Sequence, residues 1–257
     1  MGWGPRLNTL VHLPLLRRLI KPITERVLPG GYWYETVRTK GMDEIVLEEL
    51  AGGAAQLVIL GAGFDSRGYR FREQLEGKGV FEVDHPATSS LKRERVRAIF
   101  GELPEHLSYV AVDFEQDELA ERLVKAGFDE SARTIFVWSG VSMYITEEAV
   151  NGVLRFVREH AGSGSAIVFD YIFREFLEGD DSSYGAAQLR RVVERQGEPF
   201  RFGVPEGEIG AFLTRHGFAL ERHHTAAEMP ERYLADSSGQ IAGRTYECGG
   251  ICVARRP

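Results

Sequence analysis

An apolar segment that runs into a glycine-rich turn constrains the fold of this chain most strongly. Residues 57–60 are followed by Gly61-Ala-Gly63, and about one βα unit later residues 80–83 end in Asp84. Glycines in such a turn let a ligand approach the backbone, and an acid at the next strand end can accept hydrogen bonds from ribose hydroxyls. The combination predicts a crevice that binds a nucleoside-containing cofactor.

Short apolar runs alternate with helical patterns along the middle of the chain, which predicts an α/β fold with a doubly wound, Rossmann-like, mostly parallel sheet. Residues 218–225 and 246–254 lack a crossover helix of conventional length between them, so we expect them to close the sheet with an antiparallel last strand. A helix is expected from Pro205 and Glu206 to residue 216. The five apolar runs are 56–60, 79–83, 107–112, 134–138 and 165–170, and the helical patterns between them include 87–100, 117–126 and 146–160.

Length and charge exclude several classes of protein. A chain of 257 residues suits one large domain, and a net charge of −7 without a dense Lys/Arg cluster argues against a nucleic-acid partner. Cys248 and Cys252 are the two cysteines, and no third or fourth cysteine or histidine ligand stands near them in sequence. We expect buried free thiols, no metal site and a reducing, cytoplasmic location.

The N-terminal section has a different character from the rest. Its first thirty residues combine apolar and basic side chains without a long apolar run or a cleavage site, so we expect neither a signal peptide nor a membrane span. Residues 1–50 are predicted to form a helical lid or appendage, which could instead pair two subunits in a homodimer or touch a membrane surface. We favour a lid without stable membrane association. Residues 51–257 are predicted to form the cofactor-binding domain, with an acceptor-binding insertion at about 172–204.

The glycine turn fits one nucleoside cofactor better than its rivals. After Gly61 and Gly63 the next glycine is Gly68, so the third glycine of the dinucleotide fingerprint is missing. Asp65 would repel a pyrophosphate but suits a cationic ligand, although it could equally cap a helix. S-adenosylmethionine carries a sulfonium, an ammonium and a ribose diol but no phosphate. It is the predicted cofactor, with Asp84 on its ribose.

Four sequence motifs together resemble the leucine carboxyl methyltransferase family, which includes protein phosphatase carboxyl methyltransferases and bacterial O-methyltransferases of secondary metabolism. The resemblance extends over about residues 32–254 and implies S-adenosylmethionine dependence. The motifs are Leu60-Gly-Ala-Gly-Phe-Asp-Ser-Arg67, Phe81-Glu-Val-Asp-His-Pro86 followed by Lys92-Arg93, Val112-Asp113, and Trp138-Ser-Gly-Val-Ser-Met-Tyr-Ile145.

The resemblance also implies roles for individual residues. The turn residues would line the methionine portion of the cofactor, and Arg38 would grip its carboxylate. Many family members carry an acid before Gly140, where this chain has Ser139, so a hydroxyl or a backbone carbonyl would meet the cofactor ammonium here. The cofactor-binding residues expected are Arg38, Gly61, Ala62, Gly63, Asp65, Asp84 with His85 beside it, Asp113 and Phe114 at the adenine, Ser139 and Gly140.

Methyl transfer from a sulfonium needs alignment and a desolvated pocket, and a hydroxyl acceptor also needs a base. Tyr171 and Tyr144, which follow successive strands, are the candidate catalytic residues, although either could be pocket wall. The sequence predicts an O-methyltransferase that acts on a carboxylate or hydroxyl of a small metabolite. A noncatalytic cofactor-binding or regulatory protein and a protein carboxyl methyltransferase are the alternatives, and a nicotinamide-dependent oxidoreductase is disfavoured.

Overall fold

The computed structural model describes residues 14–257, with side chains from residue 21 onward, and its centre is a seven-stranded sheet. The strand order is β3-β2-β1-β4-β5-β7-β6, in which β7 is antiparallel to both neighbours and the other neighbouring pairs are parallel. The predicted fold class and antiparallel last strand are therefore confirmed. The strands are β1 (Gln56–Leu60), β2 (Gly79–Asp84), β3 (Leu107–Ala111), β4 (Thr134–Trp138), β5 (Ala166–Ile172), β6 (Ala219–Thr225) and β7 (Gly249–Arg255).

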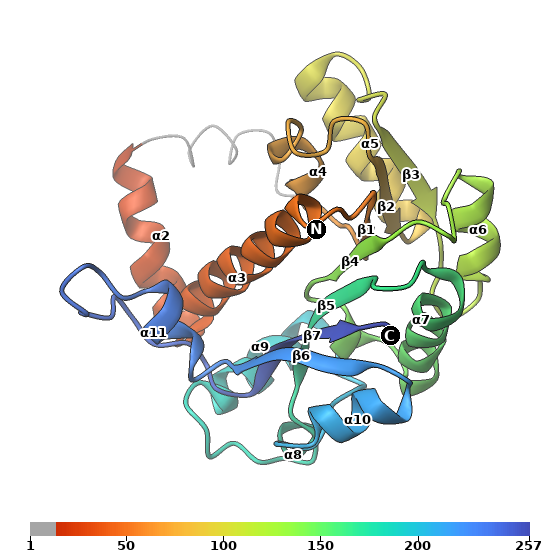
Figure 1. The fold of residues 1–257 in the computed structure, drawn as a ribbon. Helices are drawn as coiled ribbons and strands as arrows, with labels where there is room; N and C mark the ends of the chain where they lie inside the picture. The colour runs from red at the N-terminus through yellow and green to blue at the C-terminus, as the bar shows by residue number, and fades with distance from the viewer. Residues whose placement is uncertain (1–13) are drawn as a thin grey trace.

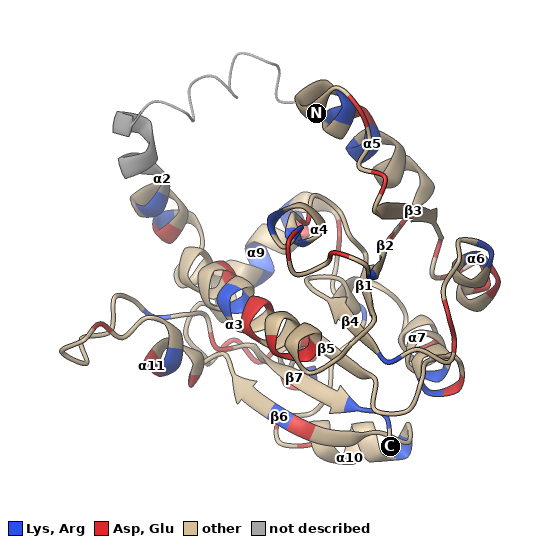
Figure 2. Ribbon diagram, turned by 45° about the horizontal axis from the view of Figure 1, so that its top comes forward, with Lys and Arg blue, Asp and Glu red and all other residues tan. Residues whose placement is uncertain are grey.

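Helices cover both faces of the sheet (Figure 1). One face carries α3 (Gly31–Ala51), α4 (Arg67–Arg70), α5 (Pro86–Phe100) and α11 (Met229–Tyr233). The opposite face carries α6 (Leu119–Lys125), α7 (Glu147–His160) and α10 (Ile209–Arg215). The N-terminal α2 (Pro14–Val27) packs against α3. Both signs of charge are interspersed on α3, α5 and α6 (Figure 2).

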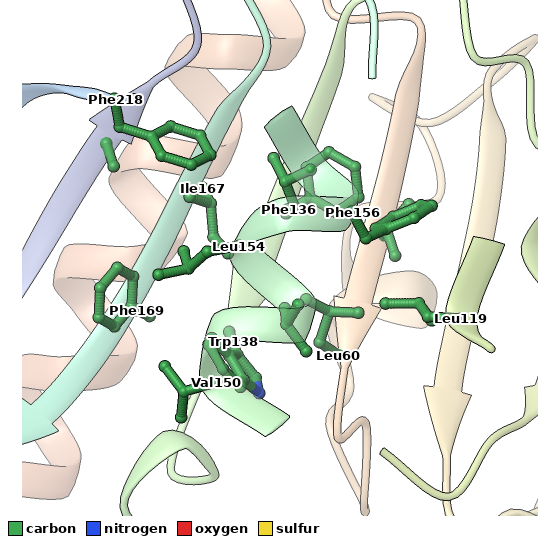
Figure 3. Packing of buried hydrophobic residues seen from close by; sticks show 14 of the residues in the cluster. Leu60, Leu119, Phe136, Trp138, Val150, Leu154, Phe156, Ile167, Phe169 and Phe218 are labelled. Carbon is green, nitrogen blue, oxygen red and sulfur yellow. The ribbon is translucent and has the colours of Figure 1, made fainter. Parts of the chain in front are cut away.

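The central strands are buried on both faces, which explains their nearly continuous apolar sequences. Side chains alternate between the faces, so Leu57 and Ile59 face α3 whereas Val58 and Leu60 face α7. Phe136, Trp138, Phe156 and other large side chains fill the space between β4, β5 and α7 (Figure 3). This packing makes the sheet a rigid support for the turns that follow its strands.

A smaller apolar cluster covers the carboxyl end of β5. It joins Tyr34 of α3 to Ile172, to Met143 of the short 3₁₀ helix η1 (Ser142–Tyr144), and to residues of α8 (Arg174–Leu177) and α9 (Ala186–Gln196). Cys248 belongs to this cluster, whereas Cys252 of β7 belongs to the large core cluster on the face covered by α6, α7 and α10, and both are buried free thiols as predicted. None of the helices in residues 14–257 is both long and apolar enough to cross a membrane.

Several sequence-based boundaries differ from the structure, and two of them have an identifiable cause. The helix expected from Pro205 and Glu206 begins instead at Ile209, because Pro205 starts a turn in which its carbonyl accepts a hydrogen bond from Glu208 N at 3.0 Å. The strand expected to end at residue 170 continues to Ile172, because residues 171 and 172 pair with the start of β7. The helix cap at Thr146 was correct, since its hydroxyl accepts a hydrogen bond from Ala149 N at 3.2 Å.

Candidate cofactor-binding site

The turn after β1 is held by the end of β2. Ala62 N donates to Val83 O at 2.9 Å, and Gly63 N donates to the carboxylate of Asp84. The other oxygen of Asp84 accepts from His85 N at 2.7 Å. A carboxylate can accept about four hydrogen bonds, so Asp84 retains capacity for a ligand diol. Asp84 therefore shapes the turn and keeps free acceptor positions, and its contact with a ribose stays a prediction.

The turns after β1 and β4 touch one another. Gly61 has φ +62°, and a Cβ built there would lie 2.3 Å from Cγ2 of Val141. Gly140 has φ +69°, and its Cβ would lie 2.7 Å from Nη1 of Arg38. Both positions therefore require glycine, for its backbone conformation and for the space it leaves. At Gly63, with φ +44°, a Cβ would meet nothing closer than the carbonyl oxygen of Gly61 at 3.9 Å.

Asp170 is a candidate site residue that the sequence analysis missed. Its side chain is fully buried near the end of β5, and Gly140 N donates to its Oδ1 at 2.6 Å. Arg38 Nη1 and the hydroxyl of Tyr34 donate to its Oδ2 at 2.9 and 3.4 Å. Asp170 thereby joins β4, β5 and α3. Its position at a strand end, like those of Asp84 and Asp113, was a signal that could have identified it.

Arg38 is the residue expected to meet the carboxylate of the cofactor. Its guanidinium pairs with Asp170 and Glu35, and its side chain is 16% exposed. Although burial opposes its charge, these two carboxylates hold the pKa of Arg38 above its ordinary value. Arg38 Nε is buried and has no hydrogen-bond partner within the described residues. An unused donor on a fixed, charged fork is suited to binding a carboxylate.

The structure favours the capping alternative for Asp65. Its Oδ1 accepts from Arg67 N at 2.7 Å, and its carboxylate also pairs with the guanidinium of Arg67. Arg67 in turn donates to Asp43 of α3 at 2.7 Å. The charge of Asp65 is thus compensated within the protein. The side chain of His85 likewise serves its own helix, because its Nδ1 accepts from Ala87 N at 3.3 Å at the start of α5.

The residues expected at the adenine follow β3. Asp113 accepts hydrogen bonds from Glu115 N at 3.0 Å and Gln116 Nε2 at 2.9 Å. Phe114 is half-buried against the core and borders a cavity of about 560 Å³ between α6 and α7. Neither Asp84 nor the glycine turn lines that cavity. The cofactor assignment therefore depends on the contacts at the strand ends and not on the cavity.

The two candidate catalytic tyrosines lie in different surroundings. The expectation that Tyr171 follows its strand and faces the acceptor was wrong, because it is fully buried inside β5, on the face opposite Asp170. Its hydroxyl hydrogen-bonds with His223 Nε2 at 2.9 Å. Tyr144 is half-buried in η1 and meets the ring of Phe200 edge-on at 5.0 Å. Burial raises the pKa of both phenols, which disfavours either as a base at neutral pH.

The strand-end contacts form a continuous series. Asp84 holds the turn that contains Gly61 and Gly63, Gly61 packs on Val141, and Gly140 next to Val141 contacts Arg38 and Asp170. Ser139, half-buried, precedes Gly140 in the same turn. The structure thus brings together most of the residues expected at the methionine and ribose portions of the cofactor, from the ends of three adjacent strands and from α3, and Asp170 adds a fourth strand.

Comparisons with known proteins are consistent with this geometry. The family model for leucine carboxyl methyltransferase matches residues 17–158. YktD of Bacillus subtilis, whose name assigns it provisionally as an S-adenosyl-L-methionine-dependent methyltransferase, is 29% identical over 205 residues, covering 80% of this chain and 67% of YktD. SCO7813 of Streptomyces coelicolor, with the same provisional name, is 37% identical over 194 residues, covering 73% of this chain and 62% of that protein. The chain thus spans about two thirds or less of the length of these two relatives.

A solved structure of a provisionally named methyltransferase from Thermobifida fusca has the same fold. It superposes with a TM-score of 0.65 at 17% identity, covering 93% of this chain and 87% of that one. Identity this low supports similarity of fold and carries no inference about the reaction.

Proposed function

Because the chain belongs to the leucine carboxyl methyltransferase family, we propose that it is an S-adenosylmethionine-dependent O-methyltransferase that acts on a small metabolite. The observation that carries the proposal is the continuous series of contacts from Asp84 through Gly61 to Arg38. Ligands of doubly wound sheets bind outside the carboxyl ends of the strands, where this series lies. The residues present fit the cofactor at its ribose and at its carboxylate.

Each part of the site has a distinct task in the proposed complex. The free acceptor capacity of Asp84 suits the ribose diol, and the unpartnered Nε of Arg38 suits the cofactor carboxylate. The open side of Gly63 lets the methionine portion lie against the backbone. When bound, S-adenosylmethionine would supply a methyl group on a positively charged sulfur for in-line transfer to an acceptor oxygen, with S-adenosylhomocysteine as the leaving group. The protein then has to align the acceptor and exclude water.

The proposed acceptor is a carboxylate or a hydroxyl. The two tyrosines help to decide between these acceptors, because only a hydroxyl needs a general base from the protein. A carboxylate is already ionised near neutral pH, whereas an alcohol benefits from a base. The raised pKa values of Tyr144 and Tyr171 make both phenols poor bases at that pH. This favours a carboxylate acceptor.

We also propose a cytoplasmic location. The buried free thiols of Cys248 and Cys252 support it, because free thiols persist in a reducing compartment.

Calorimetric titration with S-adenosylhomocysteine and with adenosine tests the two ends of the site separately. We expect Asp84→Ala to weaken binding of both ligands, because both contain the ribose. Arg38→Met is expected to weaken binding of S-adenosylhomocysteine by roughly tenfold or more, for one charge-assisted contact, and to leave adenosine binding unchanged. Arg122→Met is the control, since Arg122 lies on the exposed side of α6 and pairs with Asp117. Equal S-adenosylhomocysteine affinity for Arg38→Met and the wild-type protein would contradict the assignment.

A further inference from the structure

A buried ion pair lies directly behind the glycine turn. Lys92 of α5 places its Nζ 2.8 Å from Oε2 of Glu82 in β2, and the two side chains are 4% and 1% exposed. Removing two charges from water is costly, and apolar residues of similar volume often stabilise a fold equally well or better. The pair therefore calls for an explanation other than stability.

Lys92 connects this pair to the turn. Its Nζ also donates a hydrogen bond to the backbone carbonyl of Asp65 at 2.9 Å. Glu82 and Asp84 are two residues apart on β2, so both side chains lie on the same face of the sheet. Asp84 holds Gly63 N directly, and Glu82 reaches the carbonyl of Asp65 through Lys92. The strand thus holds the turn at two points, one through a backbone N–H and one through a carbonyl.

The surroundings of Glu82 indicate that its task is to fix the ammonium. Both carboxylate oxygens are buried and accept no hydrogen bond of good geometry from the described residues, so the close contact with Lys92 is an ionic one. Burial raises the pKa of Glu82 to about 7, although the ammonium of Lys92 opposes the rise. The ammonium also lies 5.6 Å from the centre of the Tyr69 ring. Lys92 is thereby confined between an acid, an aromatic face and one backbone carbonyl.

We propose that Glu82 and Lys92 are positioning residues that hold residues 61–65 in the conformation that binds the cofactor. Neither side chain touches the cofactor in this arrangement, since both are buried behind the turn and Lys92 acts on the carbonyl of Asp65. The inference rests on the proposed function, because it concerns affinity for S-adenosylmethionine and its product. Loss of the pair is expected to weaken cofactor binding even where the fold remains stable.

The double variant Glu82→Leu with Lys92→Met separates affinity from stability. It replaces a buried ion pair by apolar side chains, a change that is often neutral or stabilising, so we expect a folded protein in urea denaturation. We expect its affinity for S-adenosylhomocysteine to fall roughly tenfold or more, for the loss of one charge-assisted hydrogen bond that orders the turn. Wild-type affinity in the folded double variant would overturn the inference. Failure of the wild-type protein itself to bind would instead overturn the proposed function.

Two further variants keep the test decisive. Glu82→Gln keeps the size of the side chain but leaves Lys92 without its buried counter-charge, so we expect a less stable protein whose folded form binds S-adenosylhomocysteine roughly three- to tenfold more weakly. Unchanged affinity in this variant would also overturn the inference. Glu49→Leu is the matched control, because Glu49 is a buried acid of α3 that pairs with Arg133 and Arg255 away from the turn. It is expected to lower the free energy of unfolding without changing the affinity.

Discussion

Alanine at Gly61 and at Gly63 should damage the protein in different ways. Both glycines have positive φ, at which an L-residue costs roughly 1–2 kcal/mol of folding free energy. At Gly61 the new Cβ would also lie 2.3 Å from Cγ2 of Val141, and overpacking of this kind costs about 1–3 kcal/mol more. We therefore expect Gly61→Ala to lower the free energy of unfolding by about 2–5 kcal/mol, and Gly63→Ala by about 1–2 kcal/mol.

The two variants should differ in the opposite order in their affinity for S-adenosylhomocysteine. Compared with its effect on stability, Gly63→Ala should weaken binding more than Gly61→Ala does. The space beside Gly63 is open to the proposed methionine portion, so a methyl group there is expected to weaken S-adenosylhomocysteine binding well beyond its effect on folding. Urea denaturation and calorimetry on the same samples measure both quantities. Adding Val141→Ala to Gly61→Ala should recover part of the lost stability, because it removes the clashing methyl groups. Equal destabilisation by the two single alanine variants would refute the steric reasoning.

Three other predictions concern β5 and its neighbours. Asp170→Asn is expected to lower the free energy of unfolding by about 3 kcal/mol and to weaken S-adenosylhomocysteine binding, because Arg38 loses a buried charged partner. Urea denaturation identical to that of the wild-type protein would contradict the expected loss of stability. Tyr171→Phe is expected to cost about 1 kcal/mol of stability and leave calorimetric affinity unchanged, since the lost hydroxyl contacts His223; weaker binding would restore Tyr171 to the site. Burial lowers the pKa of His223 below its usual 6.5, so the unfolded chain binds that proton more tightly than the folded one. The free energy of unfolding should therefore fall as the pH drops through 6.5. Urea denaturation at pH of about 7.5 and 5.5 should show a smaller fall in His223→Phe than in the wild-type protein.

The strands and turns of the site were readable from sequence because their signals are local. Residues 56–60 and 134–138 are apolar throughout, since strands buried on both faces need no alternation, and both strands have the predicted bounds. The strand-end position of Asp84 followed from the same pattern. Its contact with Gly63 then follows from the sheet order, which brings the ends of β1 and β2 together.

The sequence was least informative where distant parts of the chain decide the outcome. It left Asp65 open between a cationic ligand and a helix cap, and the structure adds that Arg67, held by Asp43 of α3, compensates the charge of Asp65. Tyr171 was expected beyond the strand end, but pairing with β7 extends the strand and turns this side chain to the opposite face. The role of Asp170 depends equally on Arg38, which is 132 residues away in sequence. Propensity and spacing carry no information about such partners.

The central claim is that the carboxyl edge of the sheet binds S-adenosylmethionine. It is tested most directly by calorimetric titration of the wild-type 257-residue chain with S-adenosylmethionine, S-adenosylhomocysteine and NADH. The account predicts a Kd on the order of micromolar for the two sulfur compounds and no measurable binding of NADH. Folded protein that binds neither sulfur compound, or that prefers NADH, would contradict it.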